Sequence, residues 1–158
     1  MSDFEKSHVT MTELVLPTHT NALGSIFGGV LMSWIDMAAA ISAMRYAQST
    51  VVTASIDALH FIAPIYKGYI VEIKASVNYV GKTSCEIGVH IEAMNPETHE
   101  SFHCCTSYLT FVALDKKMKP KAMPPGSPEG PVEKRRFKAA ELRRKSRLEL
   151  ANKIKDNL

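Results

Sequence analysis

One aspartate, Asp36, stands in the middle of an apolar segment and is the strongest candidate in this chain for a reacting group. The segment covers residues 26–44, and between residues 14 and 44 the only other ionisable side chain is that of His19. Burial of a carboxylate without a cationic neighbour is costly, so its presence here needs a reason. Reaction chemistry is the leading one, because catalytic acids and bases are found in such surroundings. The alternative is a structural carboxylate held by neighbouring hydroxyl groups.

Two glycines, Gly28 and Gly29, lie eight and seven residues before this aspartate and mark the beginning of the helix that contains it. The first amides of a helix have no acceptor within the helix, and glycine lets a ligand come close to them. Together with the helix dipole, these N–H groups form a natural site for a carbonyl oxygen that acquires negative charge.

The elements that must position this helix are strands, and the clearest two form a hairpin. Within residues 70–79, the odd positions from 71 to 79 carry apolar side chains and the even positions from 72 to 78 carry polar ones, which is the period of a half-buried strand. Residues 85–93 repeat the pattern. The short link Gly81–Ser84 predicts that the two strands are antiparallel neighbours.

Three further segments are expected to complete the sheet. Residues 101–114 are apolar on both faces, which predicts a strand in its centre, and residues 51–61 and 9–16 are expected to form two more. A sheet of about five strands has one face to cover and only one all-apolar helix is available, so we predict an α+β fold in which the sheet wraps around that helix. The helix is then buried on nearly all sides, with three methionines as core fillers: Met32, Met37 and Met44.

The C-terminal part of the chain differs from the rest. Residues 119–131 hold five prolines and two glycines and are predicted to form a linker. Residues 133–155 lack both and predict a surface helix. Residues 131–158 carry a net charge of +6, against −3 for the rest of the chain. We therefore expect a compact domain at residues 1–118, followed at 119–158 by the linker and a basic helix.

Composition limits the class of protein. The first residues show no cationic stretch followed by an apolar one, so no secretory signal is expected. The cysteines are odd in number and include the adjacent pair Cys104 and Cys105, which favours reduced thiols over a disulfide framework. Both features predict a cytoplasmic protein. A membrane span at residues 26–44 is disfavoured by Asp36 near its middle.

The segment around the aspartate has a recognisable order. Residues 19–36 read His-Thr-Asn-Ala-Leu-Gly-Ser-Ile-Phe-Gly-Gly-Val-Leu-Met-Ser-Trp-Ile-Asp, and residues 51–57 read Val-Val-Thr-Ala-Ser-Ile-Asp. Further matching positions follow at His60, Phe61, Pro64, Lys67 and Gly68. From about residue 11 to residue 114 this series resembles the hotdog-fold acyl-CoA thioesterases of the cytosolic, brain-type acyl-CoA hydrolase kind, without a departure at the motif positions.

The resemblance implies an activity, a site and an assembly. In that family the equivalents of Asn21 and Asp36 are catalytic, and the helix N-terminus near Gly28 and Gly29 polarises the thioester carbonyl. It implies hydrolysis of acyl-CoA to a free acid and coenzyme A in fatty acid metabolism. Coenzyme A is then part of the substrate, and no separate cofactor is expected. The resemblance also implies dimers assembled into homohexamers, as trimers of dimers.

Helix geometry makes a separate demand on this site. Asp36 lies roughly 11 Å along the helix axis from the glycine pair at ~1.5 Å per residue, whereas reacting atoms must approach to about 3 Å. If two such helices lie antiparallel across a two-fold axis, the amides and Asn21 of one subunit can face Asp36 of the other. We therefore predict two sites per dimer, each at the interface. Asp36 acts there as a general base on water or attacks directly to give an anhydride, and the sequence does not separate the two routes.

An acyl-CoA carries phosphates, so a basic or amide-lined surface is expected near the site. Three groups of residues are candidates: the hairpin loop Gly81, Lys82, Thr83 and Ser84; His60 with Phe61; and the tail cations Arg135, Arg136, Arg143 and Arg144. The loop could equally be a solvated turn and the tail a solvated helix face. The loop is not a P-loop, because the upstream glycine of that motif would fall at Ser76.

Other chemistries are less well supported. His99 and His103 have metal-ligand spacing only on a helix, yet they fall in a turn and a strand, so no metal is expected. No activating base stands near a cysteine in the sequence, so the thiols are interpreted as structural. A hotdog dehydratase or hydratase would need a histidine on the helix, which has none. A non-catalytic acyl-CoA sensor remains open, while nucleic-acid binding by the tail is disfavoured because aromatic residues do not interleave with its cations.

Overall fold

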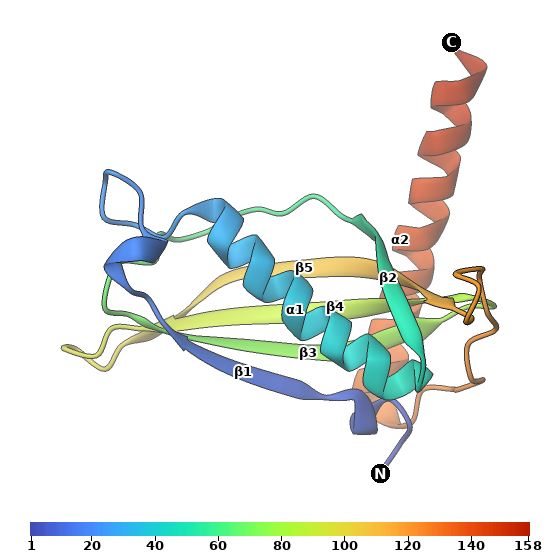
Figure 1. Cartoon of the computed structure of the whole chain (residues 1–158), viewed down its shortest axis with the longest axis horizontal. Coiled ribbons are helices and arrows are strands. Elements are labelled where there is room, and N and C mark those ends of the chain that lie inside the picture. The colour runs from blue at the N-terminus through green and yellow to red at the C-terminus, as the bar shows by residue number, and fades with distance from the viewer.

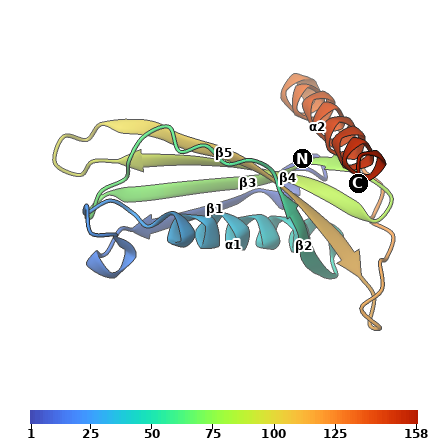
Figure 2. The same ribbon diagram turned by 90° about the horizontal axis from the view of Figure 1, so that it is seen from above.

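The computed structural model describes all 158 residues, and they form one sheet with a helix on each face. The five strands are antiparallel and lie in the order β1-β3-β4-β5-β2. The sheet curls around α1, while α2 lies on the opposite, outer face (Figures 1 and 2). The predicted α+β fold is confirmed. The elements are η1 (Glu5–Ser7), β1 (Val9–Leu14), η2 (Pro17–His19), α1 (Gly28–Ala47), β2 (Thr50–Ile56), β3 (Ile70–Val80), β4 (Ser84–Met94), β5 (Ser101–Leu114) and α2 (Gly130–Asp156).

The core lies between α1 and the inner face of the sheet. Leu31, Ile35 and Ala38 of α1 are almost completely buried, as are Ile73 and Ile87, which belong to β3 and β4. Alanines on the buried side of the helix let its backbone approach the sheet closely. The apolar odd-numbered positions of the β3–β4 hairpin thus face α1, as their alternation predicted.

The alternation fails at one point of β3. A bulge between Val77 and Tyr79 places Tyr79 opposite Glu86, on the outer face, where its ring contacts Phe137 of α2. The prediction that residue 79 continues the inner row is therefore wrong, because a bulge adds one residue and reverses the direction of the side chains after it. Asn78, at the bulge itself, is buried.

Two other strand predictions also need correction. The segment expected to form a strand over residues 51–61 ends its pairing at Ile56, after a second bulge between Thr53 and Ser55. The strand expected in the centre, β5, is internal, but the middle of the sheet is β4. Apolar side chains on both faces of β5 agree with an internal position, but they do not single out the middle strand of the sheet.

The outward face of α1 is open in the single chain, contrary to the prediction that this helix is buried on nearly all sides. Met32, Met37 and Met44 are 41%, 53% and 44% exposed, so they are not core fillers within one chain. The sheet covers only one side of the helix, and no other element of the chain reaches the opposite side (Figure 2). Neither α1 nor α2 has the combination of length and apolarity that crossing a bilayer requires.

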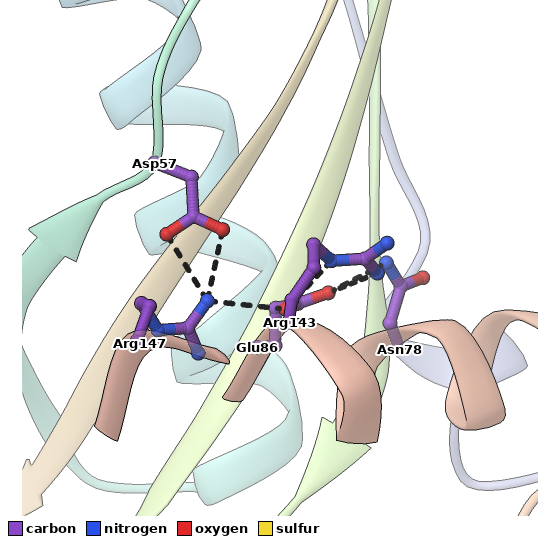
Figure 3. A network of polar contacts seen from close by, with 5 residues as sticks. All are labelled: Asp57, Asn78, Glu86, Arg143 and Arg147. Atoms are coloured by element: carbon purple, nitrogen blue, oxygen red, sulfur yellow. Dashed lines mark hydrogen bonds and ion pairs between the residues drawn. The ribbon is translucent and has the colours of Figure 1, made fainter. Parts of the chain in front are cut away.

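The basic helix predicted at residues 133–155 is present as α2, and it is fastened to the outer face of the sheet. Arg143 donates hydrogen bonds from Nε and Nη2 to the carboxylate of Glu86 at 3.1 and 2.6 Å, and Arg147 donates to Asp57 (Figure 3). The preceding linker also lies against the body, since the amide of Met123 donates to the carbonyl of Lys82.

Candidate active site

Asp36 is half-buried on the flank of α1 that faces β2. The hydroxyl of Thr53 donates a hydrogen bond to its Oδ1 at 2.8 Å. Its second oxygen, Oδ2, accepts no hydrogen bond from this chain, and no cation pairs with the carboxylate. One carboxylate oxygen is thus oriented by a hydroxyl, while the other is free to accept a proton from a reactant.

Thr53 was not among the residues predicted for the site. Thr53 lies in β2 and pairs there with Phe111 of β5. Paired residues point to the same face of a sheet, and the side chain of Phe111 is buried on the face that packs against α1, so Thr53 faces α1 too. The segment 51–57 belongs to the motif quoted above, but nothing in its sequence tells which residue meets the helix. Because 17 positions separate Thr53 from Asp36, only the packing of β2 against α1 reveals the pair.

The beginning of α1 presents free amides. The first amide with a backbone acceptor is that of Val30, which donates to the carbonyl of Phe27, so the N–H groups of Gly28 and Gly29 have no acceptor in the chain. The N-cap residue, Phe27, contributes no side-chain cap. A Cβ added at Gly29 would lie 3.1 Å from the ring of Phe27, and one at Gly28 would lie 3.6 Å from the ring of Phe61. Glycine therefore leaves room beside both amides.

Asn21 lies in an exposed turn next to this helix end. Its Oδ1 accepts from the amide of Leu23 at 2.9 Å, and its Nδ2 donates to Ser25 Oγ at 3.1 Å. Backbone contacts fix the position of this turn. Ser25 forms an isolated β-bridge with Tyr66, and the amide of Ile26 donates to the carbonyl of Ile65. In the single chain, the side-chain amide of Asn21 therefore hydrogen-bonds only within its own turn.

The predicted site residues fall into three places. Asn21, Gly28, Gly29 and Phe61 gather at the N-terminal end of α1, and His60 is exposed beside Phe61. Asp36 lies about two turns further along the helix, roughly 11 Å away. The hairpin loop 81–84 is at the far end of β3, whose eleven residues span about 36 Å at ~3.3 Å each. One chain alone does not bring these places together.

The tail cations have different surroundings from one another. Arg143 is paired with Glu86 and stacks on the ring of Tyr108 at 3.5 Å. Burial lowers the pKa of its guanidinium, but the hydrogen bond and charge of Glu86 outweigh this, so the pKa is raised overall. Arg135 and Arg136 form no ion pair and line a groove of about 680 Å³ between α2 and the sheet. Arg143 thus fastens the helix.

The three cysteine thiols are buried and unreactive in character. Burial raises the pKa of Cys85 and Cys105 to about 12 and that of Cys104 to about 11. At neutral pH they remain protonated, and a protonated thiol is a poor nucleophile. His, Cys, Asp and Glu side chains nowhere gather in threes in a way that could hold a metal ion.

Comparisons with known proteins point to one family. The family model of the thioesterase superfamily matches residues 23–98. A Bacillus subtilis protein named as an uncharacterized acyl-CoA thioester hydrolase, YkhA, is 41% identical over 125 residues, which are 79% of this chain and 73% of that protein. Mouse acyl-coenzyme A thioesterase 11 is 37% identical over 146 residues, or 92% of this chain, but the match spans only 25% of that longer protein.

Solved structures are similar over nearly the whole chain. An apo-hexameric acyl-CoA thioesterase is 40% identical with a TM-score of 0.89, covering 94% of this chain and 95% of that one. An acyl-CoA hydrolase from Staphylococcus aureus, in complex with butyryl coenzyme A, coenzyme A and coenzyme A disulfide, is 39% identical with a TM-score of 0.84, covering 96% and 95%. Structures of the same enzyme carry alanine in place of an aspartate, a threonine and an asparagine.

Proposed function

This chain belongs to the thioesterase superfamily, and from that membership we propose that it hydrolyses acyl-CoA thioesters to a free acid and coenzyme A. The names of its relatives support the reaction class. The observation that carries the proposal for this chain is the half-buried carboxylate of Asp36, held at one oxygen by Thr53 and free at the other.

The replaced residues of the S. aureus hydrolase support the same choice of residues. Along that chain its asparagine, aspartate and threonine are separated by 15 and 17 residues. Asn21, Asp36 and Thr53 have the same separations. We infer that the three residues correspond, and that Thr53 belongs to the site although it was not predicted.

In the proposed reaction Asp36 removes a proton from water as the water oxygen bonds to the thioester carbon. The carbon–sulfur bond then breaks and coenzyme A leaves as its thiolate, which takes up a proton. Direct attack by Asp36, with an anhydride that water then opens, is the other route. In either route Thr53 orients the carboxylate, and the free amides of Gly28 and Gly29 stabilise the oxyanion. The side-chain amide of Asn21 assists once it turns from its own loop.

The two halves of this site come from two copies of the chain. Asp36 lies on the flank of α1 next to β2, which is an edge strand, so a second copy at that edge can present its helix N-terminus. The exposed methionines of α1 then lie in or near the interface. Hexamers, as in the apo-hexameric neighbour, follow as trimers of such dimers. Because a second copy also supplies a second hairpin loop, residues 81–84 remain candidates for the phosphates of coenzyme A.

The cytosol is the proposed place of action, since one mouse relative is named a cytosolic hydrolase.

The experiment is release of free thiol from a panel of acyl-CoAs. Asp36→Ala should abolish it. Thr53→Val should lower kcat about tenfold to a hundredfold with little change in KM, because a hydrogen bond to a charged group contributes ~1.5–3 kcal/mol. Thr53→Ser keeps the hydroxyl and should retain most of the activity. Binding of acyl-CoA without turnover, or full activity of Asp36→Ala, would contradict the proposal.

Mixing two inactive variants tests whether the site is shared. In a dimer of one Asp36→Ala chain and one Asn21→Ala chain, one of the two sites has both residues intact. Random exchange of subunits makes half the dimers mixed, so activity should return to about a quarter of the wild-type value. If each site lies within one chain, mixing restores nothing.

A further inference from the structure

The helix α2 is longer than the surface of its own chain that it covers. Its first half crosses the outer face of the sheet, where Phe137 contacts Tyr79 of β3 and Arg143 pairs with Glu86 of β4. Its last fastening point is Arg147, which donates to both oxygens of Asp57, just after β2. Figure 3 shows the two arginines with Glu86 of β4 and with Asp57, just after the end of β2.

Beyond Arg147 the helix continues without support. Residues 148–156 extend past the β2 side of the sheet (Figure 1), over roughly 14 Å at ~1.5 Å per residue. No hydrogen bond or ion pair joins this segment to the body of the chain. In proteins the packing of an apolar face supplies most of the stability of a helix, and this segment has no such packing within its own chain, so a covering surface is expected.

This distal segment has one apolar side. Leu150, Ala151 and Ile154 follow Arg147 at spacings of three, four and seven residues, which places them on the side of the helix that faces the sheet earlier along its length. Leu150 is 60% and Ile154 53% exposed. Charged residues such as Glu149 occupy the other side. The side of α2 that packs on its own sheet therefore continues beyond the edge of that sheet as an apolar stripe, formed by Leu150, Ala151 and Ile154.

We propose that a second copy of this chain covers the stripe, so that α2 of each subunit reaches across the β2 edge and packs on the outer face of its partner's sheet. The idea rests on the proposed function, which puts the partner at that edge to complete the site. The outer face there offers an exposed apolar side chain: Val52 points away from α1, pairs with Val112 and is 46% exposed. By two-fold symmetry the contact is made twice, which makes α2 a clasp that holds the shared active sites together.

The test compares two double variants of the full chain. Leu150→Glu with Ile154→Glu places two carboxylates on the stripe, four residues apart. Leu142→Glu with Ser146→Glu places the same charges at the same spacing on the opposite side, where Leu142 is 68% exposed. The first pair should raise the dissociation constant for release of monomers from the assembly at least about tenfold in sedimentation velocity, whereas the control pair should not.

Two further readouts separate this inference from the proposed function. At protein concentrations above the raised dissociation constant, the stripe variant should recover wild-type thiol release, because it removes no site residue. In the wild type, hydrogen exchange of the amides of residues 150–156 should be slow in the dimer and fast after dilution to monomer. If the stripe variant associates as the wild type does, or if residues 150–156 exchange fast in the intact dimer, the proposed clasp is wrong. Neither result would contradict the proposed hydrolysis of acyl-CoA. Binding of the segment to anionic lipid vesicles without any effect on association would overturn it as well.

Discussion

Replacement of Arg143 by methionine should destabilise this protein strongly, because it leaves a buried charge without its main partner. The carboxylate of Glu86 is 2% exposed and accepts two hydrogen bonds from Arg143. Asn78 donates a third at 3.3 Å, and Arg147 lies 3.8 Å from Oε2 (Figure 3). Methionine keeps much of the apolar length of the arginine, so the change removes mainly the charge and its donors.

The loss of stability depends on how well Glu86 is still stabilised once Arg143 is gone. Loss of one partner from a buried ion pair costs ~3–5 kcal/mol, because the other charge stays desolvated. Here Arg147 remains within reach of Glu86, and the side chain of Arg143 is 23% exposed, so the environment is only partly dry. We therefore expect a loss of about 3 kcal/mol, at the lower end of that range. The double variant Glu86→Gln with Arg143→Met should recover most of it, since no charge is then stranded.

The assay is urea unfolding at one fixed protein concentration, with the free energy of unfolding obtained for the wild type, both single variants and the double variant. Arg135→Met is the matched control, because Arg135 lies on the same helix, is exposed and forms no ion pair. It should change stability by less than about 0.5 kcal/mol. A loss below about 1 kcal/mol for Arg143→Met would refute the reasoning, since Glu86 would then be adequately solvated without its partner.

Two more expectations concern other parts of the molecule. Gly88→Ala should lower stability by ~1–3 kcal/mol, seen as a lower urea midpoint, because the new Cβ would lie 2.4 Å from Nδ2 of Asn78 and displace it. An unchanged midpoint would mean that Asn78 moves aside at no cost. The thiols should react with a thiol reagent at pH 8 only after unfolding in guanidinium, because burial raises their pKa values to about 11 or 12; rapid labelling of the native protein would contradict this for Cys85, Cys104 and Cys105.

Sequence reasoning worked where one local pattern had one physical meaning. The alternation in residues 70–94 could place apolar side chains on one face only as a hairpin, and β3 and β4 have that form. It failed where an extra residue enters a strand, as before Tyr79, because the local pattern of side-chain types does not reveal a bulge. The exposed methionines of α1 illustrate another limit. An apolar side chain indicates that something buries it, but the sequence does not tell whether its own chain or another chain does so.

The candidate site shows the same division. Asp36 and the glycine pair could be singled out because an isolated acid and a glycine-flanked helix start are unusual in an apolar segment. The partner of Asp36 could not, since Thr53 belongs to a distant strand and the quoted segment 51–57 does not tell which of its residues meets the acid. Nor could the pairing of Glu86 with Arg143, which joins residues 57 positions apart.

By itself, the amino-acid sequence determined the types and order of the elements and singled out Asp36 as the candidate acid, because periodicity and isolation of charge are local properties. The tertiary structure alone decided which oxygen of that acid is held, which face of α1 stays open and where α2 overruns its sheet. These depend on contacts between distant segments, and the free energy of such contacts is set by packing that no short stretch of sequence contains.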